Sequence, residues 1–211
     1  MDVSTAADAE LRYVALGDSY TIGTSVAEAD RWPNRLIEAL RAQPASALLE
    51  LVANLAVNGR TSGDVVRAQL PALDALRPEF VSLLIGVNDV VQGVPEPTYR
   101  SNLGRIFEDL LGRLPIDRVL VVTTPDYTVT PSGADYGDPA TQRAVIARNN
   151  AILTEVAGAQ AVAVVDIFDI SERAATDRTL VASDGLHPSG RQYALWVDRI
   201  VPVVRGLLDG S

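Results

Sequence analysis

The stretch YVALGDSYTIGTS, residues 13–25, decides the fold of this chain. An apolar run leads directly into Gly17, Asp18 and Ser19, which predicts a buried strand that ends at a sharp turn. The Ser19 hydroxyl at that turn has three interpretations: a nucleophile at a strand end, part of a phosphate-binding loop, or a turn residue that caps the next helix. The rest of the sequence separates them.

Four similar runs follow, each rich in β-branched and aliphatic residues, at residues 49–56, 80–86, 118–124 and 161–168. Their near-continuous apolarity is typical of strands buried on both faces. Segments with helical periodicity lie between and after these runs, at residues 31–43, 62–76, 98–114, 138–158 and 189–208. The alternation predicts an α/β fold: a three-layer α/β/α sandwich with a flavodoxin-like five-stranded parallel sheet and helices on both faces.

The length of 211 residues suits one well-filled core and is too short for two ordinary domains. Residues 1–211 are therefore interpreted as a single domain, with residues 1–11 as a flexible N-terminal tail. Thr98 and Asp138 are expected at helix starts and Gly158 at a helix C-terminus.

The composition excludes several kinds of chemistry. The chain has no Cys, and all of its basic residues are Arg, so thiol catalysis, Schiff-base lysines and a P-loop lysine are excluded. Its one histidine, His187, cannot form a zinc site of several imidazoles. A net charge of -9 disfavours nucleic acid and anionic membrane surfaces as partners. The oligomeric state stays open.

The N-terminus, MDVSTAADAE, lacks the basic and apolar regions of a signal peptide, and no apolar run reaches membrane-spanning length. A cytoplasmic location is therefore expected, although a chain from which a signal peptide had been removed would look the same. Small or neutral substrates are the expected partners.

Polar residues follow the predicted strands at the edge where a parallel sheet binds its ligands. They are Ser19, Gly59 in NLAVNGRTSG, Asn88 in GVND, and the pair Asp184 and His187 in SDGLHPSG. A serine needs a base to become a nucleophile, and His187 is the only imidazole available. Asp184, three residues earlier, would orient that ring. The backbone N–H groups of Ser19 and Gly59 and the Asn88 amide would bind an oxyanion.

These four blocks, in this order and each after a predicted strand, resemble the GDSL or SGNH hydrolases over the chain from the first strand to the last helix. The resemblance implies the three-layer fold, ester hydrolysis through an acyl-serine, and no metal or organic cofactor. It implies Ser19, Asp184 and His187 as catalytic residues and Ser19, Gly59 and Asn88 as the oxyanion hole. Tyr20 stands where the family name has Leu, which bears on the shape of the pocket wall.

Several neighbours of these blocks have a structural interpretation instead. Asp18 is expected to accept backbone N–H groups at the turn, and Asp89 to cap or anchor a loop. Arg60 and Arg191 are interpreted as surface charges. Trp32 and Trp196, which lie at helical spacing beside apolar residues, are assigned to the core.

Three other functions are weighed against the hydrolase. A flavodoxin-like electron carrier would share the sheet and a loop like SYTIGTS, but it leaves Asn88 and His187 unexplained. A receiver-type signalling module would use Asp18 and Asp89 to hold magnesium, but it also needs a lysine. A binding protein that lost catalysis would not retain the whole set of catalytic side chains.

The substrate depends on two long segments, residues 88–97 and 125–139, whose Gly and Pro content predicts irregular loops. Their VVQGV and YTVT stretches offer apolar surface with few aromatic side chains, which favours a modest acyl pocket for short- to medium-chain esters. Lysophospholipase or thioesterase activity also fits, and a carbohydrate O-deacetylase of the same family is the alternative.

Overall fold

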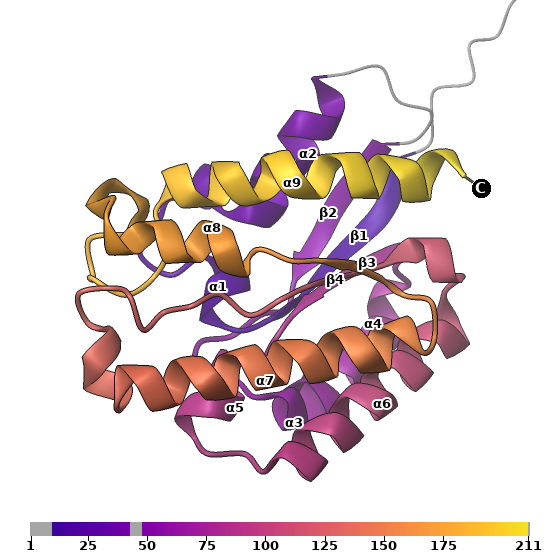
Figure 1. Ribbon diagram of the computed structural model, residues 1–211. Coiled ribbons are helices and arrows are strands. Elements are labelled where there is room, and N and C mark those ends of the chain that lie inside the picture. The colour runs from indigo at the N-terminus through magenta and orange to yellow at the C-terminus, as the bar shows by residue number, and fades with distance from the viewer. Residues whose placement is uncertain (1–9, 43–47, 211) are drawn as a thin grey trace, which may run out of the picture.

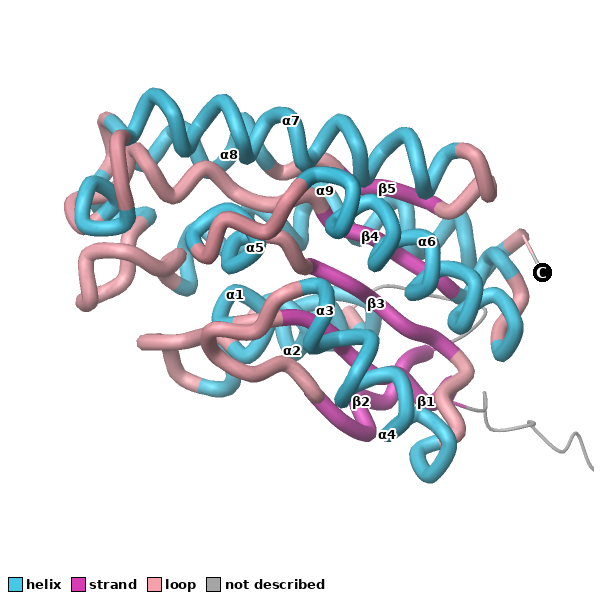
Figure 2. The backbone as a smooth tube through the Cα atoms, turned by 90° about the horizontal axis from the view of Figure 1, so that it is seen from below, coloured by secondary structure: helices cyan, strands magenta, loops and turns pink. Residues whose placement is uncertain are grey.

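The computed structural model describes residues 10–42 and 48–210 and contains one parallel five-stranded sheet. The strands are β1 (Glu10–Gly17), β2 (Leu48–Asn54), β3 (Phe80–Leu84), β4 (Val119–Val122) and β5 (Ala163–Val165). Their order is β2-β1-β3-β4-β5, as Figure 2 shows, and every neighbouring pair is parallel. The predicted α/β class and five-stranded parallel sheet are confirmed.

The helices occupy both faces of this sheet (Figure 1). They are α1 (Ser19–Ile22), α2 (Trp32–Arg41), α3 (Ser62–Asp64), α4 (Leu70–Leu76), α5 (Val87–Val91), α6 (Glu96–Arg113), α7 (Pro139–Gly158), α8 (Phe168–Glu172) and α9 (Gly190–Asp209). Helices α2 and α9 pack on one face, whereas α4, α6 and α7 cover the other. Within the described ranges, no helix is both long and apolar enough to cross a membrane.

Successive residues of a strand point to opposite faces, so each central strand contributes to two cores. In β1, Tyr13 and Ala15 belong to the core under α2 and α9, and Val14 and Leu16 belong to the core under α4, α6 and α7. All four side chains are fully buried. This double burial explains the near-continuous apolar run in the sequence.

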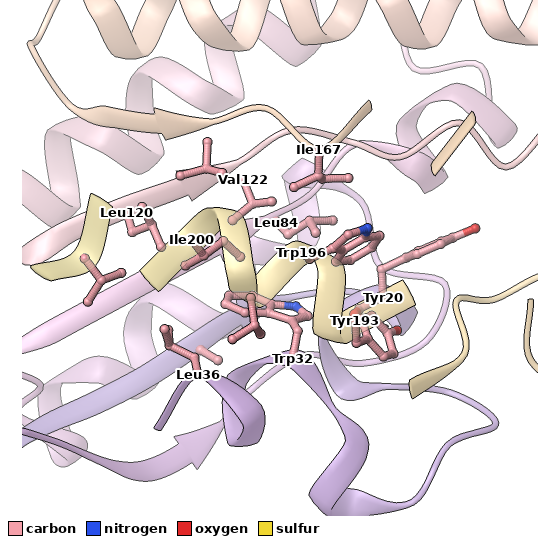
Figure 3. Packing of buried hydrophobic residues seen from close by; sticks show 14 of the residues in the cluster. Tyr20, Trp32, Leu36, Leu84, Leu120, Val122, Ile167, Tyr193, Trp196 and Ile200 are labelled. Atoms are coloured by element: carbon pink, nitrogen blue, oxygen red, sulfur yellow. The ribbon is translucent and has the colours of Figure 1, made fainter. Parts of the chain in front are cut away.

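The core beneath α9 contains several aromatic side chains among its aliphatic residues (Figure 3). Trp32 and Trp196 are fully buried there, as predicted, and Trp196 packs edge to face on Tyr193 with ring centroids 5.0 Å apart. The Tyr193 hydroxyl donates to the Tyr20 carbonyl over 3.0 Å. This hydrogen bond ties α9 to the turn that follows β1.

The boundaries differ from the sequence predictions in four places. Glu10 and Leu11 form the start of β1, so the predicted flexible tail is wrong for these two residues. Residues 1–9 lie outside the described part of the chain. Helix α6 starts at Glu96, before Thr98, because Pro97 suits the first turn of a helix. Helix α7 includes Gly158 as its last residue, and the left-handed backbone follows at Ala161.

The fourth difference concerns residues 88–97, which were predicted to be irregular. Their first part belongs to α5, whose N-cap is Gly86 with a φ of 140°. The predicted helix start at Asp138 is confirmed. Its carboxylate accepts the Thr141 N–H over 2.8 Å and caps the N-terminus of α7.

The parallel strands present their carboxyl ends at the same edge of the sheet. Beyond that edge lie the short helices α1, α3 and α5, which Figure 2 shows together at one end of the strands. Helix α1 contains Ser19, α3 follows Gly59, and α5 contains Asn88. The fold therefore brings these three predicted blocks to one edge of the sheet.

Candidate active site

Ser19 is the first residue of α1, a single helical turn that begins directly after β1. The Asp18 carboxylate caps this turn, since its Oδ1 accepts the Tyr20 N–H over 3.0 Å. Gly23 ends it with a φ of 72°, a left-handed conformation that glycine adopts without steric cost. Ser19 is buried, with 7% of its surface exposed. Its hydroxyl lies just beyond the carboxyl end of β1.

A buried glutamine fixes the strand end just before this turn. The Gln69 amide receives the Gly17 N–H at 2.9 Å and donates to the Gly17 carbonyl at 2.7 Å. Gln69 therefore pairs with Gly17 as a neighbouring strand would. Gln69 ends a π-helical segment, Val65–Gln69, which runs directly into α4 and Pro71. π-Helical turns are often found at functional sites.

Gln69 is not among the predicted site residues, although the sequence pattern carries a signal for it. Val65, Gln69 and Leu73 are spaced by four residues and all are buried. A glutamine on an otherwise apolar helical stripe indicates a buried polar group that needs a partner.

Asp18 has the structural role that was predicted, as an acceptor for the turn. Its second oxygen, Oδ2, lies 3.3 Å from the Asn88 amide nitrogen. The side chain is fully buried, and burial raises the pKa of Asp18 to about 7 because desolvation disfavours the charged form. The nearby Asp89 charge adds to this effect, and the hydrogen bonds from Tyr20 and Asn88 oppose it.

Gly59 and Asn88 lie beside Ser19 on the wall of one cavity. Gly59 has a φ of 78°, and a Cβ added to it would meet no described atom within 4 Å. Glycine is therefore favoured here by the left-handed backbone conformation and not by a lack of space for a side chain. The Asn88 amide donates to the Arg60 carbonyl over 3.0 Å and contacts Asp18 at the longer distance given above. Within the described residues, no hydrogen bond uses the N–H of Ser19 or Gly59.

Asp184 and His187 form a hydrogen-bonded pair in the loop before α9. The distance from Asp184 Oδ2 to His187 Nδ1 is 2.7 Å. Asp184 Oδ1 accepts the N–H groups of Leu186 at 2.9 Å and His187 at 3.0 Å. The Ser25 hydroxyl donates to Oδ2 over 2.7 Å. Burial opposes ionisation, but these donors outweigh it and lower the pKa of Asp184 to about 2.

The hydrogen bond at Nδ1 leaves Nε2 as the ring nitrogen that is free to exchange a proton. In the described structure, no hydrogen bond joins Ser19 to the imidazole, but both residues line the same cavity. Such contacts are often long in sites that hold no substrate.

This cavity has a volume of about 230 Å³ and brings four of the five predicted site residues together: Ser19, Gly59, Asn88 and His187. Asp184 contacts His187 but does not itself line the cavity. The remaining wall is formed by Tyr20, Asn58, Val87, Val91, Tyr127, Tyr136 and Leu186.

Aromatic side chains line more of the wall than the sequence suggested. Tyr127 and Tyr136 come from the loop at residues 125–139 and pack edge to face, with centroids 6.0 Å apart. The expectation of few aromatic side chains from this loop is therefore wrong. The Tyr20 ring lies 5.1 Å from the His187 ring, between centroids. Its hydroxyl is buried and has no hydrogen-bond partner among the described residues.

The remaining polar residues have structural roles, as predicted. Asp89 accepts the backbone N–H of Ser62 over 2.8 Å and anchors the start of α3. Arg60 pairs with Asp64 at 3.3 Å, and Arg191 pairs with Asp177 at 3.5 Å. Both arginine side chains are about half exposed or more. Over the ranges that the structure describes, no group of three His, Cys, Asp or Glu side chains is arranged to hold a metal ion.

Comparison with known proteins adds independent information. The sequence matches the GDSL-like Lipase/Acylhydrolase family over residues 15–195. It is 31% identical over 105 residues to an arylesterase from Vibrio mimicus, an alignment that covers 49% of this chain and 50% of that protein. The match therefore spans about half the length of this relative.

Solved structures share the fold over nearly the whole chain. TesA has a TM-score of 0.72 at 20% identity, covering 93% of this chain and 99% of TesA. A lipase/acylhydrolase from Enterococcus faecalis has a TM-score of 0.73 at 22% identity, covering 94% and 97%. An acetyl xylan esterase from Geobacillus stearothermophilus has a TM-score of 0.73 at 18% identity, covering 92% and 94%. The chain thus belongs to the GDSL-like lipase/acylhydrolase, or SGNH, family of carboxylic ester hydrolases.

Proposed function

We propose that this chain hydrolyses carboxylic esters through an acyl-serine intermediate on Ser19. The observation that carries the proposal is the cavity that Ser19 and His187 both line, with His187 Nδ1 held 2.7 Å from an aspartate. This arrangement supplies a nucleophile, a base and an orienting carboxylate, which together are the requirements for acyl transfer.

In the first half-reaction, Ser19 Oγ attacks the ester carbonyl carbon while its proton passes to His187 Nε2. The carbonyl π electrons move to oxygen and form a tetrahedral oxyanion. Collapse of this intermediate breaks the bond to the leaving alcohol, which takes the proton from Nε2. Asp184 stays ionised throughout, because its lowered pKa of about 2 lies far below neutral pH, and it stabilises the imidazolium.

The oxyanion has three donors within reach of the cavity. Two are the backbone N–H groups of Ser19 and Gly59, which are free of other partners in the described structure. The third is the Asn88 amide. Its 3.3 Å contact with Asp18 is the weaker of its two hydrogen bonds and is the one that an oxyanion would replace. Removing one such donor typically costs about 10²- to 10³-fold in kcat.

In the second half-reaction, His187 removes a proton from water, and the resulting hydroxide attacks the acyl carbon. The second tetrahedral intermediate expels Ser19 Oγ, which recovers its proton from the imidazolium. The products are a carboxylic acid and the regenerated enzyme, so no co-reactant other than water is needed.

The size of the cavity supports a short acyl group. Its volume of about 230 Å³ lies below the roughly 300–1,000 Å³ of pockets that hold drug-sized ligands. The walls combine aliphatic side chains, Val87 and Val91, with Tyr127 and Tyr136. Esters of short acids with an apolar or aromatic alcohol match these walls better than long-chain lysophospholipids or thioesters.

A carbohydrate O-deacetylase is the second candidate, and one side chain favours it. Tyr136 is 41% exposed beside a cavity of a size that suits an acetyl group. An exposed tyrosine ring offers an apolar face on which a sugar could stack.

The test measures hydrolysis of p-nitrophenyl esters from acetate to palmitate by the wild type, Ser19→Ala and Ser132→Ala, beside acetate release from acetylated xylo-oligosaccharides. Ser132 is the control because it does not line the cavity and its hydroxyl lies 3.5 Å from the Asp184 backbone carbonyl. We expect the highest kcat/KM at two to four acyl carbons and a loss of about 10⁴-fold or more in Ser19→Ala only. Equal activity in the wild type and Ser19→Ala would contradict the proposal. An optimum at long chains would contradict the short-acyl assignment, and faster deacetylation of the oligosaccharides would favour the second candidate.

A further inference from the structure

A serine far from the catalytic set in sequence contacts the Asp184–His187 pair. Ser25 lies in the loop between α1 and α2, and its hydroxyl donates to Asp184 Oδ2 over 2.7 Å. The same oxygen lies 2.7 Å from His187 Nδ1. Ser25 and the imidazole therefore share one carboxylate oxygen.

The two carboxylate oxygens of Asp184 differ in the kind of donor that holds them. Oδ1 already accepts two backbone N–H groups from its own loop, those of Leu186 and His187. Oδ2 receives only side-chain donors, Ser25 and His187, and the Asp184 side chain is 29% exposed. Without the Ser25 hydroxyl, water would compete for the oxygen that orients the imidazole.

The backbone of Ser25 is held in a conformation that costs energy. Its φ is 66°, in the left-handed region where residues other than glycine are uncommon. Gly23, with a φ of 72°, sets the chain direction before it, and the neighbouring Thr24 hydroxyl donates to Asn58 over 2.8 Å. A strained residue persists where its surroundings over-determine it, often near functional sites.

We propose that Ser25 is a positioning residue that holds the Asp184 carboxylate in register with His187. It does not touch the substrate. It acts by fixing Oδ2, so that the imidazole keeps the orientation in which Nε2 faces the cavity. This inference rests on the proposed function, because it assigns Ser25 a role in the same hydrolytic site.

The decisive variant is Ser25→Gly. It removes the hydroxyl and also relieves the left-handed strain, so a purely structural role predicts unchanged or higher stability with unchanged turnover. The positioning role predicts a fall in kcat of about tenfold, the value of one hydrogen bond to a charged group, with KM changed less than twofold. Ser25→Ala should lower kcat equally while leaving the strain in place.

A second measurement does not depend on activity. His187 is the only histidine in the chain, so the low-field proton NMR signal of its Nδ1–H is a single resonance. We expect this signal to shift and to exchange faster with water in both Ser25 variants. Ser132→Ala is the control, since the Ser132 hydroxyl lies 3.5 Å from the Asp184 backbone carbonyl and does not touch the carboxylate.

The outcomes separate this inference from the proposed function. Wild-type kcat together with a wild-type imidazole signal in Ser25→Gly would overturn the positioning role. If Ser19→Ala kept full activity, the proposed function would fail, and the NMR comparison alone would decide whether Ser25 holds the pair. An altered signal in Ser132→Ala as large as that in Ser25→Gly would also count against Ser25, because it would show a response of the whole loop.

Discussion

Asp18 and Asp184 serve the two halves of the proposed machinery, and their surroundings move their pKa values in opposite directions. Asp18, at the nucleophile turn, is fully buried, and that burial raises its pKa to about 7. Asp184, in the histidine loop, is less buried and accepts hydrogen bonds from Ser25, Leu186 and His187, which lower its pKa to about 2. Asp184 is therefore charged at neutral pH, where the imidazole needs its charge, whereas Asp18 titrates near neutrality.

The two regions also differ in how they are held. The nucleophile turn follows the central strand β1 and is fixed by buried contacts from Gln69 and Tyr193. The histidine loop is held by backbone hydrogen bonds, such as that from the Ala182 N–H to the His187 carbonyl at 2.8 Å, and by hydrogen bonds to the Asp184 carboxylate close to the surface. Substitutions of the residues that hold the turn should therefore affect stability, and substitutions of those that hold the imidazole should chiefly affect turnover.

Among substitutions of the residues that support Ser19 and His187, the largest expected effect is on the loop side. Asp184→Asn places an amide nitrogen or a neutral oxygen against His187 Nδ1, which disturbs the tautomer and removes the charge that stabilises the imidazolium. We expect kcat to fall by about 10²- to 10⁴-fold with KM little changed, and the free energy of unfolding to fall at neutral pH, because the ionised Asp184 carboxylate accepts hydrogen bonds that the variant loses. Steady-state kinetics and urea unfolding measure the two quantities.

The matched control is Asp177→Asn. Asp177 caps the turn at Thr179 in the same part of the chain, and it has no contact with His187. Its variant should keep wild-type kcat. If Asp184→Asn also turned over substrate at the wild-type rate, another group would have to orient the imidazole.

The next effect is on the nucleophile side, where stability should respond. Gln69→Leu removes the partner of the buried Gly17 N–H and leaves the Gly17 carbonyl with the longer 3.4 Å hydrogen bond from the Val57 N–H, at about 1–2 kcal/mol for each lost hydrogen bond. We expect the free energy of unfolding to fall by about 2–4 kcal/mol, measured by urea denaturation. A variant as stable as the wild type would show that water or the neighbouring backbone can replace the Gln69 amide.

The pH dependence of stability should differ in sign between the two aspartates. Asp184 has a pKa below its ordinary value of 3.8, so its stabilising contribution is complete above about pH 4 and is lost as the pH falls toward 2. Asp18 has a pKa raised from 3.8 to about 7, so it binds a proton more tightly when folded. Its contribution therefore falls as the pH rises from about 4 to 7.

Asp18→Asn and Asp184→Asn isolate these contributions in urea unfolding at several pH values. Relative to the wild type, the free energy of unfolding of Asp18→Asn should increase as the pH rises from about 4 to 7. Asp184→Asn should be less stable than the wild type above about pH 4, and this difference should disappear as the pH falls below about 4. Parallel pH profiles for the wild type and Asp18→Asn would mean that Asp18 is ionised in the folded protein as readily as in the unfolded chain.

The smallest effect is expected at Tyr20, which connects the two regions. It follows Ser19 in α1, and its ring packs against His187. Because its buried hydroxyl has no partner in the described structure, Tyr20→Phe should leave stability unchanged or raise it by less than about 1 kcal/mol. A loss above that value, measured by thermal or urea unfolding, would reveal a bound water or another partner at this hydroxyl.

Much of the fold was predictable because each strand is buried on both faces. The apolar runs in the sequence mark all five strands. Three of the residues that follow them line the cavity: Ser19, Gly59 and Asn88. Parallel topology then brings these sites to one edge, whatever the intervening helices do.

The sequence could not predict contacts that depend on loop conformation. Tyr136 lies in a short 3₁₀ turn, Gly133–Tyr136, within a long loop, and Ser25 lies in a loop with a left-handed backbone, so no hydrophobic periodicity places either residue. Gln69 depends on a π-helical turn, which shifts a side chain relative to an α-helix of the same sequence. The π-helical turn cannot be read from hydrophobic spacing alone.

The most direct test of the account is covalent trapping with diethyl p-nitrophenyl phosphate, followed by intact and peptide mass spectrometry. Ser19 Oγ should attack phosphorus and expel p-nitrophenolate, which leaves one diethylphosphoryl group per chain on the peptide that contains Ser19. Activity should fall in proportion to labelling, and Ser19→Ala should stay unlabelled. An enzyme that remains active with Ser19 fully modified, or is inactivated by a label on another residue, would contradict serine catalysis at this site.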